Sequence, residues 1–361
     1  MRILILANHD IGLYKFRREL IEELVRDHEV SIALPQGEYC ARLEALGCQI
    51  HPFDFARRGM NPFADFMQIS RYRKLFRQIR PDVVLTYTIK PNVYGGIACQ
   101  KENIPYIANV TGLGTSIENG GLLSKLVLAL YRYGLRKAKC VFFQNPANAA
   151  FFRSKNVIAG KSRIIPGSGV NLEFFVASPY PEDAGESRLL FVGRIMKDKG
   201  IEEFLEAVRI VRQGGDNVVG DIVGPCEEDY QPVLRSVEEE GLIRYHGLQD
   251  DMRPFYAKAH VVVLPSYHEG KSNVLLEASA SARPIVTTRV PGCQEICEEG
   301  TTGFLCAPQD ADSLSEAIVK LIHLPREKRQ EMGEKARQKM EKEYDRKLVI
   351  QAYREEIEDI R

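Results

Sequence analysis

Two glutamates and two basic residues in the second half of the chain have the residue types and the spacing of a ligand site. Glu269 and Glu277 lie in HEGKSNVLLE with seven residues between them, and Arg194 and Lys199 lie in GRIMKDKG. Two carboxylates can act as a general acid and base, or can accept hydrogen bonds from sugar hydroxyls. An Arg and a Lys beside a helix start suit a diphosphate. Taken alone, the same residues could form ordinary exposed loops, with Glu277 favoured as a helix-start acid.

The neighbouring residues place both motifs where strands end and helices begin. The strand LLFVGRI ends at Gly193, and a helix is expected from Gly200. After the strand HVVVLPS, Gly270 permits a tight turn and Ser272 is expected to be the N-cap of the helix NVLLEASASA. The amino terminus of that helix would face the diphosphate, and Glu277, one turn in, would accept hydrogen bonds from a ribose diol.

Short apolar runs alternate with amphipathic segments along the whole chain, which predicts an α/β protein of two doubly wound, Rossmann-like domains. We expect an acceptor-binding domain over 1–168 and a donor-binding domain over 187–345, with the final helix, 346–361, crossing back to the first domain. The segment between Ile165 and Arg188 is rich in Pro, Gly and acidic residues and is expected to be a linker. Each domain should bind ligands at the carboxyl ends of its strands, around a central cleft.

The motifs in the second half resemble those of the retaining glycosyltransferases of family 4, which have the GT-B fold. The resemblance rests on GRIMKDKG, VLPSYHEGKSNVLLEASASARPIV and PGCQEICEEGTTGFLCAP, in that order. It implies that Arg194 and Lys199 hold the donor diphosphate, that Glu277 binds the ribose and that Glu269 contacts the donor sugar. It also implies donor contacts from the strand end at Gly193 and from the backbone groups of the turn, namely those of Gly270, Lys271, Ser272 and Asn273.

The first domain departs from the family at one position. Many members have a His after the strand that corresponds to PYIANV, whereas this chain has Val110, Thr111 and Gly112. Thr111 can donate a hydrogen bond but cannot act as a cation. We expect NVTGLGTSIENGG to be a glycine-rich active-site loop with Thr111 in the catalytic centre and Gly112 near the acceptor, although a flexible connection would also have this composition.

NVTGLG and PGSGVNLEFF resemble a subgroup that builds bacterial surface glycans on polyprenyl-diphosphate carriers. Residues 1–166 contain 24 Lys and Arg against 13 Asp and Glu, and the remaining residues contain 25 against 36. A basic first domain suits an anionic acceptor, whereas the acidic second half makes binding to long nucleic acids unfavourable. His9 and Arg17, at the first strand-to-helix crossing, are the expected acceptor contacts. Arg17 and Arg18 could also simply coat a helix.

Two segments of the first domain have the composition of a helix that binds an anionic membrane surface. Residues 70–80, SRYRKLFRQIR, combine basic residues with aromatic and aliphatic ones, and LLSKLVLALYRYGLRKAK is a second candidate. A buried helix with one charged face explains either segment as well. No run approaches the roughly 18 apolar residues of a membrane span.

The remaining composition predicts an intracellular enzyme that works without a cofactor. The start, MRILILANHD, becomes polar too early for a signal peptide, so we expect a cytoplasmic protein at the inner face of the membrane. Eight Cys without a Cys-x-x-Cys pair are expected to be reduced core thiols. No metal is expected, because the family relies on Arg, Lys and helix N–H groups to stabilise the leaving diphosphate.

The sequence therefore predicts a transferase that moves a hexose or N-acetylhexosamine from a UDP-sugar to a lipid-linked saccharide with an α-linkage. An isomerase of the same fold, of the UDP-N-acetylglucosamine 2-epimerase type, is the alternative, although the two glutamates and GRIMKDKG disfavour it. A two-domain solute-binding protein would share the architecture but would require export.

Overall fold

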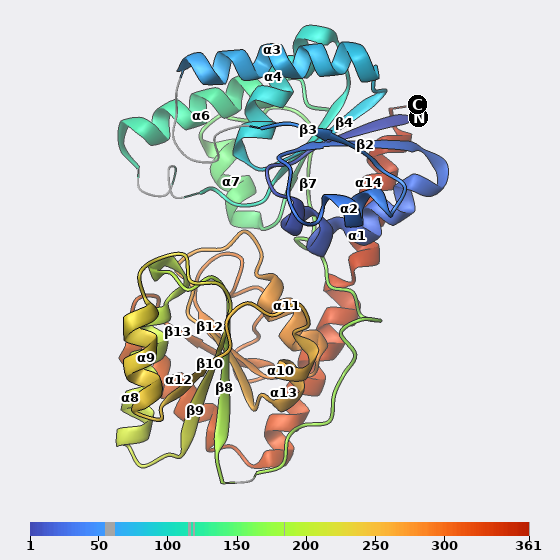
Figure 1. Cartoon of the computed structure of the whole chain (residues 1–361). Coiled ribbons are helices and arrows are strands. Elements are labelled where there is room, and N and C mark those ends of the chain that lie inside the picture. Colours follow the sequence, from blue (N-terminus) through green and yellow to red (C-terminus); the bar gives the residue numbers. More distant parts are fainter. Residues whose placement is uncertain (55–61, 115–116, 118–119, 184, 361) are drawn as a thin grey trace. The chain divides into compact units, whose positions relative to one another are not determined.

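A computed structural model describes all of the chain except residues 55–61, 115–116, 118–119, 184 and 361, and over 62–66 it describes the backbone alone. The chain divides into two compact units, residues 1–168 with 346–361, and residues 169–345 (Figure 1). Each unit is a parallel sheet with helices on its faces, as the alternation of apolar and amphipathic segments predicts.

The sheet of the first unit has seven strands in the order β3-β2-β1-β4-β5-β6-β7, and all pairs are parallel. The strands are short, and the five inner ones are largely apolar and buried, because both faces of the sheet are covered there, whereas the edge strands are more polar and partly exposed. The seven strands are β1 (Arg2–Leu6), β2 (Glu29–Leu34), β3 (Gln49–Pro52), β4 (Val83–Tyr87), β5 (Tyr106–Val110), β6 (Cys140–Phe143) and β7 (Ser162–Ile164).

Helices cover the two faces of this sheet with separate apolar cores. One core joins the sheet to α3 (Pro62–Ile79), the π-helical turn η1 (Pro91–Gly95), α4 (Gly96–Glu102), α6 (Gly121–Leu135) and α7 (Pro146–Ser154). The other joins it to α1 (Asp10–Asp27), α2 (Cys40–Glu44) and α14 (Arg346–Glu358). Figure 1 shows α3, α4 and α6 on one side of the sheet and α1, α2 and α14 on the other.

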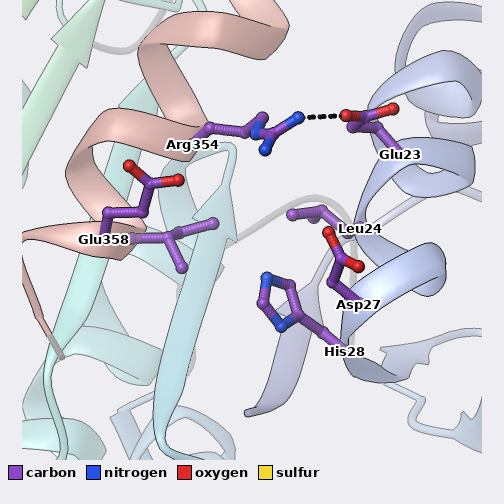
Figure 2. A pocket seen from close by; sticks show the side chains of 7 residues that line it. Glu23, Leu24, Asp27, His28, Arg354 and Glu358 are labelled. Atoms are coloured by element: carbon purple, nitrogen blue, oxygen red, sulfur yellow. Dashed lines mark hydrogen bonds and ion pairs between the residues drawn. The ribbon is translucent and has the colours of Figure 1, made fainter.

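The terminal helix α14 belongs to the first unit, although the whole second unit precedes it in the sequence. Tyr353 is buried in the core on the α1 side, and its hydroxyl accepts a hydrogen bond from Asn109 Nδ2 at 2.8 Å. Where α14 meets the carboxyl end of α1, a pocket of about 420 Å³ opens, with Arg354 paired to Glu23 beside it (Figure 2). The pocket is lined by Glu23, Leu24, Asp27, His28, Arg354, Ile357 and Glu358. It lies at the amino-terminal edge of the strands, away from the edge where open α/β sheets bind ligands.

The outer layer of the first unit contains both predicted membrane helices, and they differ in what they expose. On α3, Tyr72 and Phe76 are buried, while Arg73 and Arg77 both pair with Glu102. The apolar side of residues 70–80 is therefore part of the core. On α6, one side is buried in the same core, but leucines remain exposed on the other side.

The sheet of the second unit has six parallel strands in the order β10-β9-β8-β11-β12-β13. The strands are β8 (Ser187–Val192), β9 (Val218–Val223), β10 (Ile243–Tyr245), β11 (Val261–Leu264), β12 (Ile285–Thr288) and β13 (Gly303–Cys306). The helices are the 3₁₀ turn η2 (Lys197–Lys199), α8 (Ile201–Gln213), α9 (Gln231–Glu239), α10 (Arg253–Lys258), α11 (Asn273–Ala280), α12 (Ala311–Ile322), α13 (Arg326–Lys339) and the π-helical turn η3 (Met340–Tyr344).

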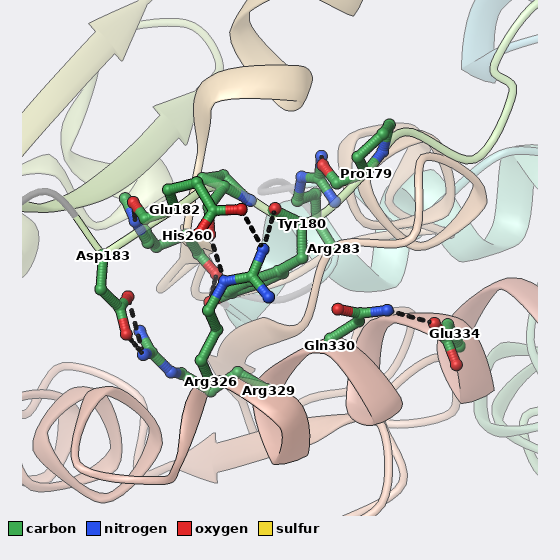
Figure 3. A network of polar contacts seen from close by, with 11 residues as sticks. Pro179, Tyr180, Glu182, Asp183, His260, Arg283, Arg326, Arg329, Gln330 and Glu334 are labelled. Atoms are coloured by element: carbon green, nitrogen blue, oxygen red, sulfur yellow. Dashed lines mark hydrogen bonds and ion pairs between the residues drawn. The ribbon is translucent and has the colours of Figure 1, made fainter.

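The second unit begins at Gly169, earlier than the predicted start at residue 187. The expected linker is bound to this unit by three arginines (Figure 3). The guanidinium of Arg283 is fully buried and donates to the backbone carbonyls of Ser178 and Pro179. Arg326 donates to the carbonyl oxygen of Tyr180, and Arg329 pairs with an aspartate of the same segment. Its Pro, Gly and acidic content predicted a linker, but Arg283 and Arg326 hold its backbone and Arg329 holds one of its carboxylates.

No helix of the described chain is both long enough and apolar enough to span a bilayer. All eight cysteines are free, and seven of them are buried, as expected for core thiols.

Candidate active site

The donor motifs follow the two central strands of the second unit. The strand order reverses between β8 and β11, which pair in parallel. Such a reversal leaves a crevice at the carboxyl ends of the two strands, where open α/β sheets bind ligands. Arg194 and Lys199 follow β8, and the segment from Glu269 to Glu277 follows β11. The sheet topology therefore brings the two motifs to one place.

Lys199 and Glu269 are in direct contact at this crevice. Lys199 Nζ lies 2.5 Å from Glu269 Oε1, and both side chains are 17% exposed. The loops are also joined through their backbones, since Tyr267 N–H donates to Asp198 O at 3.0 Å. The carboxylate of Glu269 thus accepts a charge-assisted hydrogen bond from the ammonium.

A glycine makes this close approach possible. Gly200 caps α8 with a φ of 73°, in the left-handed region, and a Cβ atom there would lie 2.2 Å from the carbonyl oxygen of Pro265. Any other residue would both strain the backbone and push the β11 loop away. The helix start predicted at Gly200 is confirmed, and it fixes the position of Lys199.

Arg194 lies at the exposed side of the crevice. Its guanidinium pairs with Glu227 at 2.9 Å, and half of the Arg194 side chain is exposed. An exposed pair of this kind contributes little to stability and exchanges readily for another anion. The arrangement leaves Arg194 able to turn to a phosphate group.

The turn after β11 presents the amino terminus of α11 to the crevice. Ser272 is the N-cap, as predicted, and its Oγ accepts from Leu275 N–H. The next side chain, Asn273, has a buried Oδ1 that accepts no hydrogen bond from the described residues. A buried acceptor without a donor is expected to receive one from a ligand or from water.

Glu277 lies one turn into α11, where Tyr256 orients it. The Tyr256 hydroxyl donates to Glu277 Oε2 at 3.0 Å, and the Tyr256 side chain is fully buried in α10. Burial raises the pKa of Tyr256 well above 10, so the phenol remains a donor. The sequence analysis missed Tyr256, because nothing in the spacing of α10 distinguishes it from a core aromatic.

The side chain of Lys271, within the turn whose backbone groups are expected to contact the donor, is directed into the unit. Its ammonium is buried, lies 3.4 Å from Glu295 Oε2, and stands over the ring of Tyr344 at 5.6 Å. Burial lowers the pKa of Lys271, and the charge of Glu295 opposes that shift. The same carboxylate accepts from Gly292 N–H at 2.7 Å. The charge of Lys271 therefore anchors the turn, and a donor contact from Lys271 is left to its backbone.

Gly292 presses against the turn from the other side. Its carbonyl accepts from Ser272 N–H at 3.0 Å, and a Cβ atom at this position would lie 2.4 Å from the carbonyl oxygen of Glu269. The turn that carries Glu269 is thus held by neighbours from two loops. Gly292 and Glu295 belong to PGCQEI, which the sequence analysis used for the resemblance without assigning a role to either residue.

The predicted acceptor contacts of the first unit, His9 and Arg17, each contact different neighbours in that unit. His9 caps α1, with Nδ1 accepting from Gly12 N–H at 3.2 Å. Arg17 is only 4% exposed, stands over the ring of Tyr87 at 5.3 Å and lies 3.5 Å from the carbonyl oxygen of Gly167. The alternative that Arg17 coats the helix surface is wrong, because the guanidinium is inside the unit.

Thr111 and Gly112 follow β5 at the carboxyl edge of the first sheet and are partly exposed. Four residues of the predicted loop NVTGLGTSIENGG, namely 115–116 and 118–119, lie outside the described residues. Roles of Thr111, Gly112, His9 and Arg17 in acceptor binding stay predictions. In the described chain, no group of three or more His, Cys, Asp or Glu side chains is arranged to hold a metal ion.

Two protein-family models match the chain, one for each unit. Residues 186–323 match the model of glycosyl transferases group 1, and residues 2–145 match a glycosyl transferase 4-like model. The N,N'-diacetylbacillosaminyl-diphospho-undecaprenol alpha-1,3-N-acetylgalactosaminyltransferase of Campylobacter jejuni is 28% identical over 98% of this chain and 97% of its own length. The capsular polysaccharide biosynthesis glycosyltransferase CapM of Staphylococcus aureus is 31% identical over 44% of this chain and 42% of its own length.

Solved structures share the fold along the whole chain. HepE of Anabaena, crystallised with UDP and glucose, superposes with a TM-score of 0.81 at 18% identity, covering 99% of this chain and 100% of its own. Sucrose-phosphate synthase of Thermosynechococcus elongatus also gives 0.81, at 20% identity, covering 98% of both chains. At such low identity these likenesses show the fold alone, a GT-B fold of two Rossmann-like domains.

Proposed function

Because the chain is a group 1 glycosyltransferase with the GT-B fold, we propose that it transfers a hexose or N-acetylhexosamine from a UDP-sugar to a lipid-linked saccharide in the synthesis of a bacterial surface glycan. The observation that carries the donor half of this proposal is the contact between Lys199 and Glu269 at the reversal of the strand order. Both matched models describe glycosyltransferases, which disfavours the epimerase alternative.

In the proposed complex, the donor lies along the carboxyl ends of β8 and β11. The diphosphate meets Arg194, Lys199 and the free N–H groups at the start of α11. The ribose hydroxyls donate to Glu277, which Tyr256 holds in place. The sugar lies beside Glu269, whose ionised carboxylate accepts from a sugar hydroxyl.

We assign retention of configuration to an ion-pair-like displacement on one face of the sugar. The bond between the anomeric carbon and the diphosphate oxygen breaks, and the acceptor hydroxyl oxygen bonds to the same face of that carbon, giving an α-linkage. The acceptor proton passes to the departing diphosphate. Lys199 and Arg194 stabilise the negative charge that develops on the leaving group, which is the role of a preorganised cationic site. Thr111 is proposed to donate a hydrogen bond in the same centre.

The acceptor is proposed to be a saccharide on a polyprenyl diphosphate. The Campylobacter jejuni relative is named for an undecaprenol diphosphate substrate and matches almost the full chain. The excess of Lys and Arg in residues 1–166 supports an anionic acceptor at the first unit. Such a substrate is embedded in a membrane, so we also propose that the enzyme works at the inner face of the cytoplasmic membrane.

A thermal-shift panel tests the donor. UDP and UDP-sugars should raise the melting temperature. A ligand that binds only the folded state, present at a concentration of 100 times its Kd, stabilises that state by about 2.7 kcal/mol. ADP and GDP serve as controls. Glu277→Ala should weaken the UDP response, whereas an equal response in Glu277→Ala would remove that residue from the ribose site. If no nucleotide shifts the wild type, the donor proposal fails.

A transfer assay tests the acceptor. The enzyme is incubated with the stabilising UDP-sugar and a polyprenyl-diphosphate-linked saccharide, and the lipid product is analysed by mass spectrometry. The expected product is heavier by one sugar residue, with an α-linkage by nuclear magnetic resonance. A product with a β-linkage would rule out the retaining mechanism.

A further inference from the structure

We propose that the outward face of α6 is a membrane-docking surface that inserts its leucines into an anionic bilayer. This inference rests on the proposed lipid-linked acceptor and identifies the part of the first unit that meets the lipid. It replaces residues 70–80 as the segment that supplies the apolar contact.

The outward face of α6 is apolar where a helix on a water-facing layer is usually polar. Leu122 is 84% exposed, Leu123 48%, Leu126 51% and Tyr133 48%. Positions 122, 126 and 133 are separated by four and seven residues, so their side chains lie on one stripe of the helix. The three leucines lie in the amino-terminal half of α6, and Tyr133 lies further along, near its carboxyl end.

The opposite face of α6 is already used for packing. Val127, Leu128 and Tyr131 are buried in the core that α6 shares with the sheet. The exposed leucines are not part of this core. A helix that is apolar on two faces is stable when each face meets an apolar partner. The protein core is the partner of one face.

The charge on the exposed face indicates what kind of partner this face meets. Lys125, Arg132 and Arg136 are exposed on this face, and residues 120–139 contain no Asp or Glu. Arg132 donates to the backbone carbonyls of Lys155 and Asn156, so its charge is not neutralised by a carboxylate there. Exposed leucines within a cationic surface complement an anionic lipid bilayer. A second copy of the same face would bring cations against cations.

Tyr133 and Arg136 fit the headgroup level of such a membrane. The guanidinium of Arg136 stands over the Tyr133 ring at 5.3 Å. An aromatic ring and a long cationic side chain both place an apolar body against lipid and a polar end in water. The leucines at the start of the helix would then lie deeper than this pair.

The other basic helix of this layer lacks the apolar part. Among its side chains that the structure describes, Met67 is the one large apolar residue of α3 that is exposed. Arg73 and Arg77 pair with Glu102, which leaves Arg71, Lys74 and Arg80 as cations without a carboxylate contact in the described structure. Since α3 and α6 cover the same face of the sheet, α3 can add electrostatic attraction at the edge of the proposed surface.

Vesicle flotation with the purified full-length protein tests the proposal. Vesicles of phosphatidylcholine with phosphatidylglycerol are compared with phosphatidylcholine alone. The wild type should float with the anionic vesicles, and the double variant Leu122→Ser, Leu126→Ser should bind them at least about tenfold more weakly, since two leucines lose burial. Leu248→Ser, at a residue 63% exposed on the second unit, is the matched control and should float like the wild type.

Further variants decide whether α6 or α3 is the main docking surface. The pair Arg71→Gln, Lys74→Gln should reduce flotation less than the leucine variant does, and the reverse order would overturn the assignment to α6. Equal flotation of the leucine variant and the wild type, or failure of the wild type to float, would overturn it as well. A wild-type dimer that the leucine variant converts to a monomer, measured by light scattering, would assign the face to a second copy.

The UDP thermal shift separates this proposal from the proposed function. The leucine variant should keep the wild-type UDP response, because α6 lies in the unit without the donor motifs. Flotation without any nucleotide response would contradict the donor proposal and leave the docking surface supported. A nucleotide response without flotation would support the donor proposal and contradict the docking surface.

Discussion

The two units are built on the same parallel architecture, but their strand ends carry different chemistry. In the second unit, Lys199 and Glu269 follow the two strands at the reversal of the strand order and touch each other on partly exposed loops. In the first unit, the basic residue expected near the corresponding place, Arg17, is buried over Tyr87. Similar sheets therefore do not place their basic residues alike: the arginine is buried among residues of its own unit, whereas the lysine lies on a partly exposed loop.

The largest expected effect is on the second unit. Lys199→Met should lower kcat/KM for the donor by about 100-fold or more, because it removes a cation that stabilises the leaving diphosphate. Steady-state transfer kinetics measure it. Lys197→Met is the matched control, since Lys197 is 62% exposed and pairs loosely with Glu202 at 3.8 Å. Equal losses in the two variants would show that Lys199 acts only as one more positive charge.

A smaller effect of a different kind is expected from Arg17→Gln. The change removes a buried guanidinium from Tyr87 and from the Gly167 carbonyl, and should cost about 1–3 kcal/mol of unfolding free energy. Urea denaturation measures it. Arg18→Gln, which breaks an exposed pair with Glu22, should cost less than about 1 kcal/mol. If a variant at Arg17 keeps its stability but has a raised KM for the acceptor, Arg17 acts in ligand binding. The first unit would then resemble the second in having a basic residue that meets a ligand at this place.

The smallest expected effect concerns the hydrogen bond by which Tyr256 orients the carboxylate of Glu277 in the second unit. Tyr256→Phe should weaken UDP binding about fivefold, because Glu277 loses one hydrogen bond of about 1 kcal/mol while the packing is kept. Isothermal titration with UDP measures the change. Tyr180→Phe also removes a buried hydroxyl, one that donates to His260 O at 2.9 Å, and should bind UDP like the wild type. If both variants bind UDP equally well, Tyr256 has no role in positioning Glu277.

The sequence was sufficient for those features of the site that depend on neighbouring residues. The N-cap at Ser272 and the helix start at Gly200 follow from local chemistry, and both are confirmed. The parallel strands follow from their apolar composition in the same way. Such features need no knowledge of distant contacts, because a cap or a strand is defined within a few residues.

Residues whose surroundings come from distant parts of the chain could not be predicted. The side-chain partner of Lys271 is one such case, because its ammonium meets Glu295, 24 residues away. Arg17 meets Gly167, 150 residues away, and the burial that results is invisible in its own segment. The side-chain partners in such cases are set by the packing of whole elements, which residue types and spacing do not specify.

The place of α14 in the first unit has a consequence for how the protein folds as it is made. The second unit is one continuous stretch, 169–345, so its core can close as soon as that stretch has been synthesised. The first unit must wait, because Val349, Tyr353 and Ile357 complete its core and are translated after the second unit. Residues 1–168 would therefore leave the ribosome with one face of their sheet partly uncovered, while the unit that follows them is already able to fold.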